Sequence, residues 1–129
     1  MKRTPRISEA EWEVMRILWQ SGPKTTNEIV EELTARTPWK TETVRTLIHR
    51  LMRKKAVSYK KHGRQYLYSP KVAEADCVRA ETKTFLDRFH GGSVEPMLAA
   101  MVEHEQLTPA QIKRLKQILD GKGLSNKKS

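Results

Sequence analysis

The sequence has almost no cysteine, few aromatic residues and no long apolar run. Cys77 is the one cysteine among 129 residues, so an internal disulfide is excluded and no CxxC pair exists for zinc or redox chemistry. No stretch approaches the roughly 20 apolar residues that span a bilayer, and no apolar segment follows the basic N-terminus as in a secretory signal. We therefore expect a cytoplasmic protein with no membrane insertion.

Known catalytic and cofactor motifs are also missing. There is no glycine pattern for phosphates or dinucleotides and no GxSxG, and the four histidines lack the spacing of metal ligands. His104-Glu105 begins like the HExxH of zinc proteases, but Thr108 stands where the second histidine belongs. Cys77 either has a lowered pKa near a helix start or, as we favour, is a small helix residue without a special role. We expect no enzyme, no cofactor and no metal site.

What the sequence has in excess is positive charge. The 25 Lys and Arg outnumber the 15 Asp and Glu, which gives a net charge of +10. Residues 36–64 contain 10 basic residues and 1 acidic residue, whereas residues 71–129 are nearly balanced, with 10 and 8. So basic a small protein usually meets a polyanion, either nucleic acid or an anionic membrane surface. The polyanion site is therefore expected in the first half of the chain.

Two capping boxes predict the starts of the first two helices. Ser8 with Glu11, and Thr25 with Glu28, have the spacing at which a hydroxyl and a carboxyl group cap each other's backbone N–H. A Gly-Pro pair at 22–23 ends the first helix, and the next proline ends the second. Both short helices are thus predicted from local signals alone.

The third helix is predicted from Lys40-Thr41 to about Lys55, with one apolar and one basic side. Two short strands rich in aromatic and β-branched residues, 57–60 and 65–68, follow around a turn that contains glycine. Three helices and a basic hairpin predict a mainly α protein with a winged helix-turn-helix domain over residues 1–70. The apolar stripe of the third helix consists of Val44, Leu47, Ile48 and Leu51.

Residues 71–121 are predicted to form a three-helix dimerisation region, and residues 122–129 a disordered tail. We expect a first helix over residues 72–90, which two glycines end. A second helix should begin after Ser93 as its N-cap, and a third should run from a capping box at Thr108 to Gly121. Three short helices rarely enclose a dry core, so we favour a core shared by two chains over an intrachain core. The residues expected in that core are Phe85, Phe89, Leu98, Met101, Val102, Ile112, Leu115, Ile118 and Leu119.

The basic side of the third helix and the hairpin tip are predicted to bind double-stranded DNA. A run of charge is usually only a solvated surface, but this one has almost no acids, and its helix fits a major groove roughly 12 Å wide. Glu42 either accepts from a cytosine or pairs with Arg45, and Arg53, Lys54 and Lys55 either join this surface or only offset the helix dipole. Base edges and nearby phosphates are assigned to Arg45, Thr46, His49 and Arg50, phosphates at helix starts to Thr25, Thr26, Asn27, Lys40, Thr41 and Thr43, and the flanking backbone to Lys60, Lys61 and Arg64.

The order of these segments resembles the BlaI/MecI penicillinase-repressor family of bacteria. The segments are ISEAEWEVMRILW, TTNEIVEEL, WKTETVRTLIHRLMRKKAV and the wing YKKHGRQYLYSP, and the resemblance continues through FLDRFHGGS and LTPAQIKRLKQIL. Members are winged-helix repressors that form homodimers through C-terminal helices and bind palindromic operators. The resemblance implies that Lys40, Thr41, Thr43, Arg45 and Thr46 lie at the operator-reading end of the third helix.

The resemblance also implies how the repressor is released. In this family a membrane-bound sensor with a zinc-protease domain triggers cleavage of the repressor, which weakens dimerisation and frees the DNA. The best-known members are cut at an Asn-Phe pair, where this chain has Ala100-Met101. The cysteine pattern of the related copper-responsive repressors is absent, which disfavours copper sensing. The alternative function is a winged-helix adaptor that binds proteins without reading DNA. An RNA binder is less favoured, since the basic face shows no aromatic platform for bases.

Overall fold

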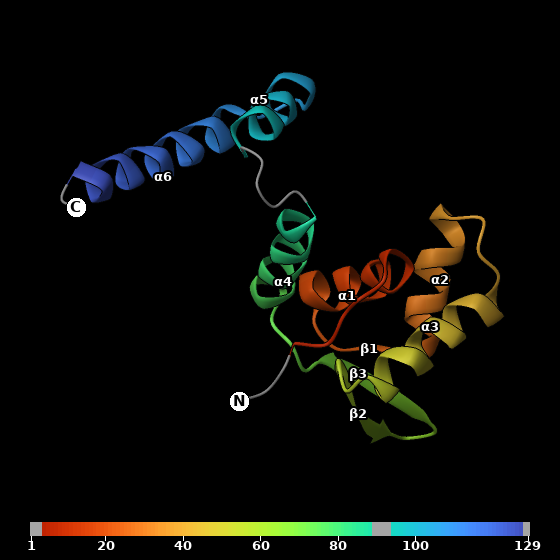
Figure 1. Ribbon diagram of the computed structural model, residues 1–129. Helices are drawn as coiled ribbons and strands as arrows, with labels where there is room; N and C mark the ends of the chain where they lie inside the picture. The colour runs from red at the N-terminus through yellow and green to blue at the C-terminus, as the bar shows by residue number, and fades with distance from the viewer. Residues whose placement is uncertain (1–3, 89–93, 128–129) are drawn as a thin grey trace. The chain divides into compact units, whose positions relative to one another are not determined.

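The computed structural model describes residues 4–88 and 94–127, with side chains placed as far as residue 122. The chain divides into two units, Met1–Arg88 and Phe89–Ser129. Both are mainly helical, as predicted, and the first also holds a small antiparallel sheet (Figure 1). The elements are α1 (Glu9–Ser21), β1 (Lys24–Thr25), α2 (Thr26–Arg36), α3 (Thr41–Arg53), β2 (Val57–His62), β3 (Gln65–Pro70) and α4 (Glu74–Asp87) in the first unit, and α5 (Glu95–His104) and α6 (Pro109–Lys127) in the second.

The capping boxes predicted at α1 and α2 are confirmed. The Ser8 hydroxyl accepts the Glu11 backbone N–H at 3.1 Å, and the Glu11 carboxylate accepts the Ser8 N–H at 2.9 Å. Thr25 and Glu28 make the same two bonds at 3.2 and 2.9 Å. Gly22 ends α1 with a φ of 80°, a left-handed conformation that glycine adopts without strain.

The core of the first unit lies between α1, α2, α3 and the hairpin. The predicted stripe of α3 is confirmed, since each of its four residues is 4% exposed or less. Burying each such side chain stabilises the fold by roughly 1.5–3 kcal/mol. Because α3 is held by this stripe, its opposite, basic side is turned to solvent. The four residues are Val44, Leu47, Ile48 and Leu51.

The sheet has the strand order β1-β3-β2, and its two-residue strand β1 was not predicted. Lys24 and Thr25 of β1 pair with β3, which ties the beginning of α2 to the hairpin. The hairpin turn is shorter than predicted, because its last pair joins His62 to Gln65. Gly63 has a φ of 66°, as two-residue hairpin turns require.

The helix α4 belongs to the first unit, which ends at Arg88, whereas the sequence predicted a domain boundary at residue 70. The indole N–H of Trp19 donates to the Val72 carbonyl oxygen at 2.9 Å, just before this helix. Cys77 is 2% exposed and part of the core of this unit. Burial, together with neighbouring carboxylates, raises the pKa of the Cys77 thiol. The interpretation of Cys77 as a residue with a lowered pKa is therefore wrong.

The helices of the second unit differ from prediction in their bounds. The N-cap of α5 is Val94, while the predicted cap Ser93 lies outside the described residues. The predicted capping box at α6 forms, with the Thr108 hydroxyl accepting the Gln111 N–H at 3.1 Å. However, α6 continues through Gly121 to Lys127, so the predicted helix end at Gly121 is wrong. Each of the two glycines in this helix, Gly121 and Gly123, costs only about 1 kcal/mol.

The residues predicted to form a dimer core are exposed in the single chain. None of the described side chains of α5 and α6 is buried, which overturns the intrachain core for these helices. None of the helices within the described ranges combines the length and apolar character needed to cross a membrane. Phe89 lies outside the described residues, and the exposed fractions of the others are 39% for Phe85, 52% for Leu98, 50% for Met101, 54% for Val102, 40% for Ile112 and Leu115, 48% for Ile118 and 64% for Leu119.

Candidate nucleic-acid interface

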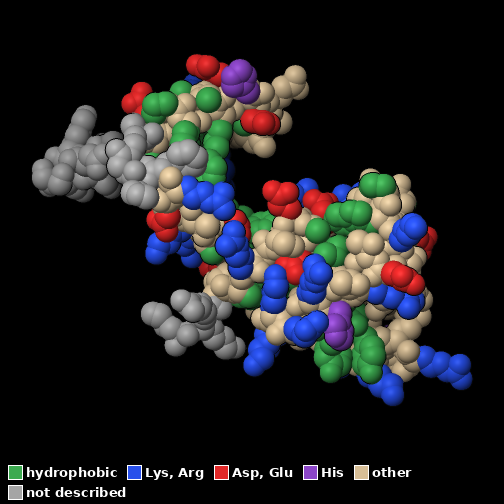
Figure 2. Space-filling model, turned by 45° about the vertical axis from the view of Figure 1, so that its right-hand side comes forward, with side chains coloured by type: hydrophobic (Ala, Val, Ile, Leu, Met, Phe, Trp, Pro, Cys, Tyr) green, Lys and Arg blue, Asp and Glu red, His purple; other side chains and the backbone are tan. Residues whose placement is uncertain are grey.

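The solvent side of α3 carries the predicted base-reading residues. Arg45, Thr46, His49 and Arg50 are all exposed, and together with Arg53 they line one shallow hollow. Figure 2 shows lysine and arginine side chains spread over the first unit, next to a histidine and a small group of exposed hydrophobic side chains. This surface has the positive charge and the exposed helix that binding in a DNA groove requires.

The backbone fixes where α3 ends. The N–H of Ala56 donates to the carbonyl oxygen of Leu51 at 2.9 Å, and the N–H of Lys55 donates to the carbonyl oxygen of Met52 at 3.0 Å. Lys55 has a φ of 62°, the left-handed position that glycine usually occupies in this motif. At the other end the N-cap Lys40 makes no side-chain cap bond. The helix end is thus defined at the cost of one strained lysine.

Lys54 does not join the solvent side of α3. Its ammonium group donates to the buried carboxylate of Glu11 and, at 2.8 Å, to the carbonyl oxygen of Arg6. Burial opposes ionisation of Glu11, but the hydrogen bond and charge of Lys54, with the N–H and hydroxyl of Ser8, outweigh it and lower the pKa of Glu11. Lys54 therefore ties the end of α3 to the start of α1, a role that neither sequence alternative named.

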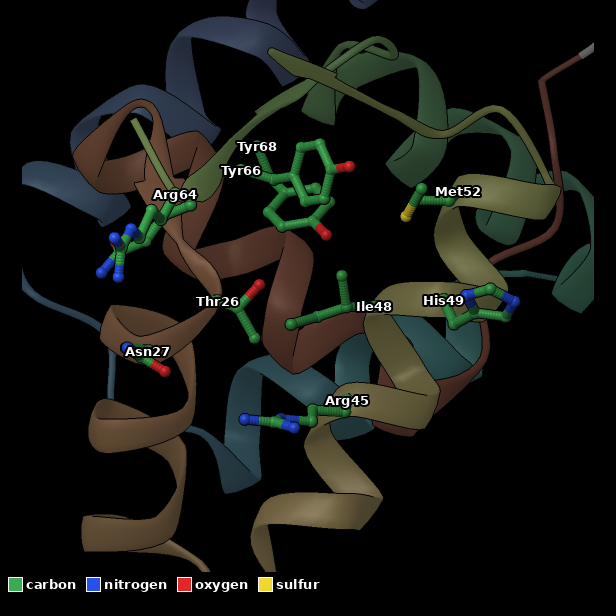
Figure 3. A pocket seen from close by; sticks show the side chains of 10 residues that line it. Thr26, Asn27, Arg45, Ile48, His49, Met52, Arg64, Tyr66 and Tyr68 are labelled. Carbon is green, nitrogen blue, oxygen red and sulfur yellow. The ribbon is translucent and has the colours of Figure 1, made fainter. Parts of the chain in front are cut away.

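A groove of about 390 Å³ opens between the start of α2, the middle of α3 and β3 (Figure 3). Figure 3 shows Arg45 extending from α3 towards α2, and Arg64 of the hairpin turn lying beside the beginning of α2. Polar groups of Thr26 and Asn27 lie between these two arginines. The lining residues are Thr26, Asn27, Arg45, Ile48, His49, Met52, Arg64, Gln65, Tyr66 and Tyr68.

The groove gathers some of the predicted residues from three elements, and leaves others outside. The hydroxyl of Thr25 is already used as the N-cap of α2, and that of Thr46 donates to the Glu42 carbonyl oxygen at 2.9 Å. Within residues 4–88 and 94–122 no ion pair joins Glu42 to Arg45. Five of the predicted residues line the groove, while four others lie exposed elsewhere on or before α3. The five are Thr26, Asn27, Arg45, His49 and Arg64, and the four are Lys40, Thr41, Thr43 and Arg50.

The register of the hairpin separates the two predicted lysines of the wing. Lys60 is paired with Leu67, and Lys61 with Tyr66. Because successive residues of a strand point to opposite faces, Lys60 and Lys61 lie on different sides of the wing. Lys61 shares its face with the buried residue Val57, the side on which the core and α3 lie.

Sequence reasoning missed an exposed aromatic pair on this same face. Tyr59 and Tyr66 are 53% and 46% exposed, and their rings meet edge to face with centroids 5.1 Å apart. The prediction that the basic face carries no exposed aromatic side chains, which disfavoured RNA binding, is therefore wrong. The period of two along the strands could have placed Tyr59, Lys61 and Tyr66 together, once the pairing of the strands was known.

Comparison with known proteins gives consistent matches along the chain. The family model described as penicillinase repressor matches residues 7–121. The penicillinase repressor of Bacillus licheniformis is 37% identical over 120 residues, which cover 93% of this chain and 94% of that protein. The methicillin resistance regulatory protein MecI of Mammaliicoccus sciuri is 35% identical over 120 residues, with 93% and 98% covered. The solution structure of monomeric Bacillus licheniformis BlaI in complex with the blaP half-operator matches with a TM-score of 0.52 and 39% identity, over 59% of this chain and 93% of that chain.

Proposed function

Because this chain belongs to the penicillinase repressor family, we propose that it represses transcription by binding, as a homodimer, a palindromic operator in double-stranded DNA. The family consists of DNA-binding regulators and not of enzymes. A BlaI structure that was determined with a half-operator matches 59% of this chain. In a bacterial cell the protein would act on the chromosome, in the cytoplasm.

One observation carries the DNA-binding part of the proposal: α3 buries its apolar stripe completely and leaves a basic side in solvent. Residues 36–64 hold 10 basic residues and 1 acidic residue, so this surface lacks the carboxylates that would neutralise it. Each phosphate that such a surface neutralises lowers the slope of log affinity against log salt by about 0.9. We expect roughly 6–10 phosphate contacts across a dimer, and hence a steep loss of affinity with salt.

The exposed apolar side chains of α5 and α6 support the homodimer. Seven large hydrophobic residues of these two helices are 40% to 64% exposed in the single chain, namely Leu98, Met101, Val102, Ile112, Leu115, Ile118 and Leu119. Exposed apolar side chains in such number are typical of a protein–protein interface. A second copy would cover it symmetrically, and two α3 helices about 34 Å apart would then read the two halves of a palindrome.

The DNA-binding proposal is tested by selecting bound duplexes from a random pool with the full chain. We expect a palindromic consensus, and an affinity for it that falls about a thousandfold or more between 50 and 200 mM salt. If the selection returned no consensus, or if affinity hardly changed with salt, the proposal would be wrong. An adaptor that reads no DNA would likewise give no sequence-selective complex.

The homodimer is tested by placing a charge on the exposed face of α6. Leu115→Glu should give a monomer in analytical ultracentrifugation and a large loss of affinity for the full palindrome, because a carboxylate cannot be buried unpaired in an apolar interface. Gln117→Glu adds the same charge to an exposed polar position of the same helix and should remain dimeric. A monomeric wild type, or an unaffected Leu115→Glu dimer, would contradict this part.

The same proposal includes release by proteolysis at Ala100-Met101, triggered by a membrane-bound sensor protease. In the single chain both residues are exposed on α5, with Met101 50% exposed, although Met101 is also one of the residues that the proposed dimer would cover. This helix has ten residues and no buried side chain, so it can open locally into the extended form that a protease binds. Limited digestion with thermolysin, a zinc protease that cleaves before large apolar residues, should cut first in α5 and abolish dimerisation. A first cut elsewhere would contradict the proposal.

A further inference from the structure

Two arginines to which the sequence assigned different tasks line a single groove. Arg45 was assigned to base edges or nearby phosphates, and Arg64 to the DNA backbone beside the wing. In the structure both belong to the groove between α2, α3 and β3, with Thr26 and Asn27 between them (Figure 3). Two cations in one shallow site repel each other unless an anion lies between them.

No acid compensates the two arginines from within the groove. Its ten lining residues include no aspartate or glutamate, and neither arginine takes part in an ion pair among the residues that the structure describes. Glu28, the acid of the first turn of α2, is occupied because its carboxylate accepts the backbone N–H of Thr25 at 2.9 Å. The groove is therefore a site of net positive charge with neutral donors at its centre.

The three walls of the groove are held in place by the fold. Thr25 pairs with Leu67 of β3, so the first turn of α2 is joined directly to the hairpin that carries Arg64. On the third wall, Ile48 next to Arg45 is 3% exposed and fixes α3 against the core. A site whose walls are preorganised in this way loses little conformational entropy when it binds.

We propose that this groove holds one backbone phosphate of the operator, which Arg45 and Arg64 bind from opposite sides and to which Thr26 and Asn27 donate hydrogen bonds. The inference rests on the proposed function and makes Arg45 a phosphate contact. Guanidinium groups bind phosphate oxygens through two parallel N–H donors. The apolar floor, with Met52 and the half-exposed ring of Tyr66, offers a surface for the deoxyribose beside that phosphate.

The proposal assigns phosphate contacts and base contacts to different residues. Phosphate contacts fix register and orientation but carry no sequence information. If Arg45 binds a phosphate, base edges are left to Thr46, His49 and Arg50, which together with Arg45 line the neighbouring hollow on α3. Because Arg45 and His49 border both hollows, the phosphate and base contacts come from adjoining positions of one helix, and substitutions at Arg45 and at Thr46 or Arg50 should separate them.

The test combines variants with operator duplexes in which one phosphate at a time is replaced by an uncharged methylphosphonate. The full chain, Arg45→Ala, Arg64→Ala and the double variant are compared on the selected operator and on base-substituted versions of it. Arg79→Ala is the matched control, since it removes one exposed arginine from α4, outside the groove. Arg45→Lys keeps the charge but loses the planar fork.

We expect each alanine variant to lose affinity about tenfold per half-site, equally on all duplexes, whereas Arg79→Ala loses little. At one phosphate position per half-site, methylphosphonate should lower the affinity of the wild type for the operator but should not lower the affinity of either alanine variant any further. The double variant should lower the salt slope by about 0.9 per half-site, because one phosphate is lost, and not by about 1.8. Arg45→Lys should restore the slope without restoring the full affinity.

A change in base preference with Arg45→Ala would overturn the inference. It would also be overturned if the phosphate position at which methylphosphonate no longer weakens binding differed between Arg45→Ala and Arg64→Ala. In either case the wild type still selects its operator, so the proposed function stands. If the wild type selects no DNA sequence at all, the proposed function fails and the phosphate site fails with it.

Discussion

The ion pair between Glu11 and Lys54 should contribute strongly to the stability of the DNA-binding unit. The Glu11 side chain is 2% exposed and the Lys54 side chain 35%, and the pair joins α1 to the end of α3. Lys54→Met removes the cation but keeps most of the apolar stem, so the buried carboxylate loses its partner. Breaking a buried pair in this way costs roughly 3 kcal/mol at pH 7.

The pH dependence of this cost has a definite sign. The pKa of Glu11 is lowered in the folded wild type, because the bonds from Lys54 and Ser8 outweigh burial. Its contribution to stability is therefore full above the pKa of an unfolded glutamate, about 4.3, and is lost as pH falls through the lower folded value. Lys54→Met removes the hydrogen bond and the charge that lower this pKa, so the pKa of Glu11 should be higher in the variant and its carboxyl group should be protonated first there. The difference between the two proteins should be largest near pH 7 and shrink towards pH 4.

Urea denaturation followed by tryptophan fluorescence measures this difference, since all three tryptophans lie in the first unit. Arg53→Met is the matched control, because it removes an exposed cation from the same helix and should change stability by no more than about 0.5 kcal/mol. In the double variant with Glu11→Gln, part of the lost stability should return, since no buried charge remains. A cost below about 0.5 kcal/mol at pH 7, or a cost that does not vary with pH, would refute the reasoning.

Three further predictions concern single positions of the first unit. Lys55→Gly should raise the free energy of unfolding by about 0.5–1 kcal/mol, because the φ of 62° strains a lysine, whereas Lys55→Ala should not raise it in the same denaturation assay. The Cys77 thiol should react with a disulfide reagent slowly in the native protein and rapidly in urea, since it is buried and its pKa is raised, and fast native reaction would contradict its place in the core. Trp19→Phe should destabilise the unit by about 1 kcal/mol and speed hydrogen exchange in α4, because the bond to Val72 is lost, and unchanged exchange would show that this bond does not hold α4.

Interactions between residues close in sequence were predictable, and distant ones were not. The capping boxes of α1 and α2 and the stripe of α3 depend on neighbours three or four positions away, and all formed as expected. The two-residue strand β1 has no such signal, because its existence depends on pairing with Leu67 and Tyr68. Likewise the partners Glu11 and Lys54 stand 43 residues apart, and only the fold brings them together.

The candidate site shows the same division. The period of α3 predicted that Arg45, His49 and their neighbours would point away from the core, and the structure places them there. That Arg45 and Arg64 line one groove could not be predicted, because it depends on the register of β3 against β1 and on a turn of only two residues. The periodicity of a helix identifies its exposed side chains but not the segments that they approach.

An apolar stripe predicts that a helix face is buried, but not what buries it. In α4, Cys77 turns into the core of the first unit while Val78 is 47% exposed, so this helix has apolar residues on two sides. In α5 and α6 no described side chain is buried, and each half-exposed large side chain forgoes part of the roughly 1.5–3 kcal/mol that full burial would contribute. Helices as short as α5 are marginal in water without such packing. If the proposed dimer forms, we therefore expect folding of the second unit and dimer formation to be one process, whose free energy depends on protein concentration, while the first unit is stabilised by a core of its own.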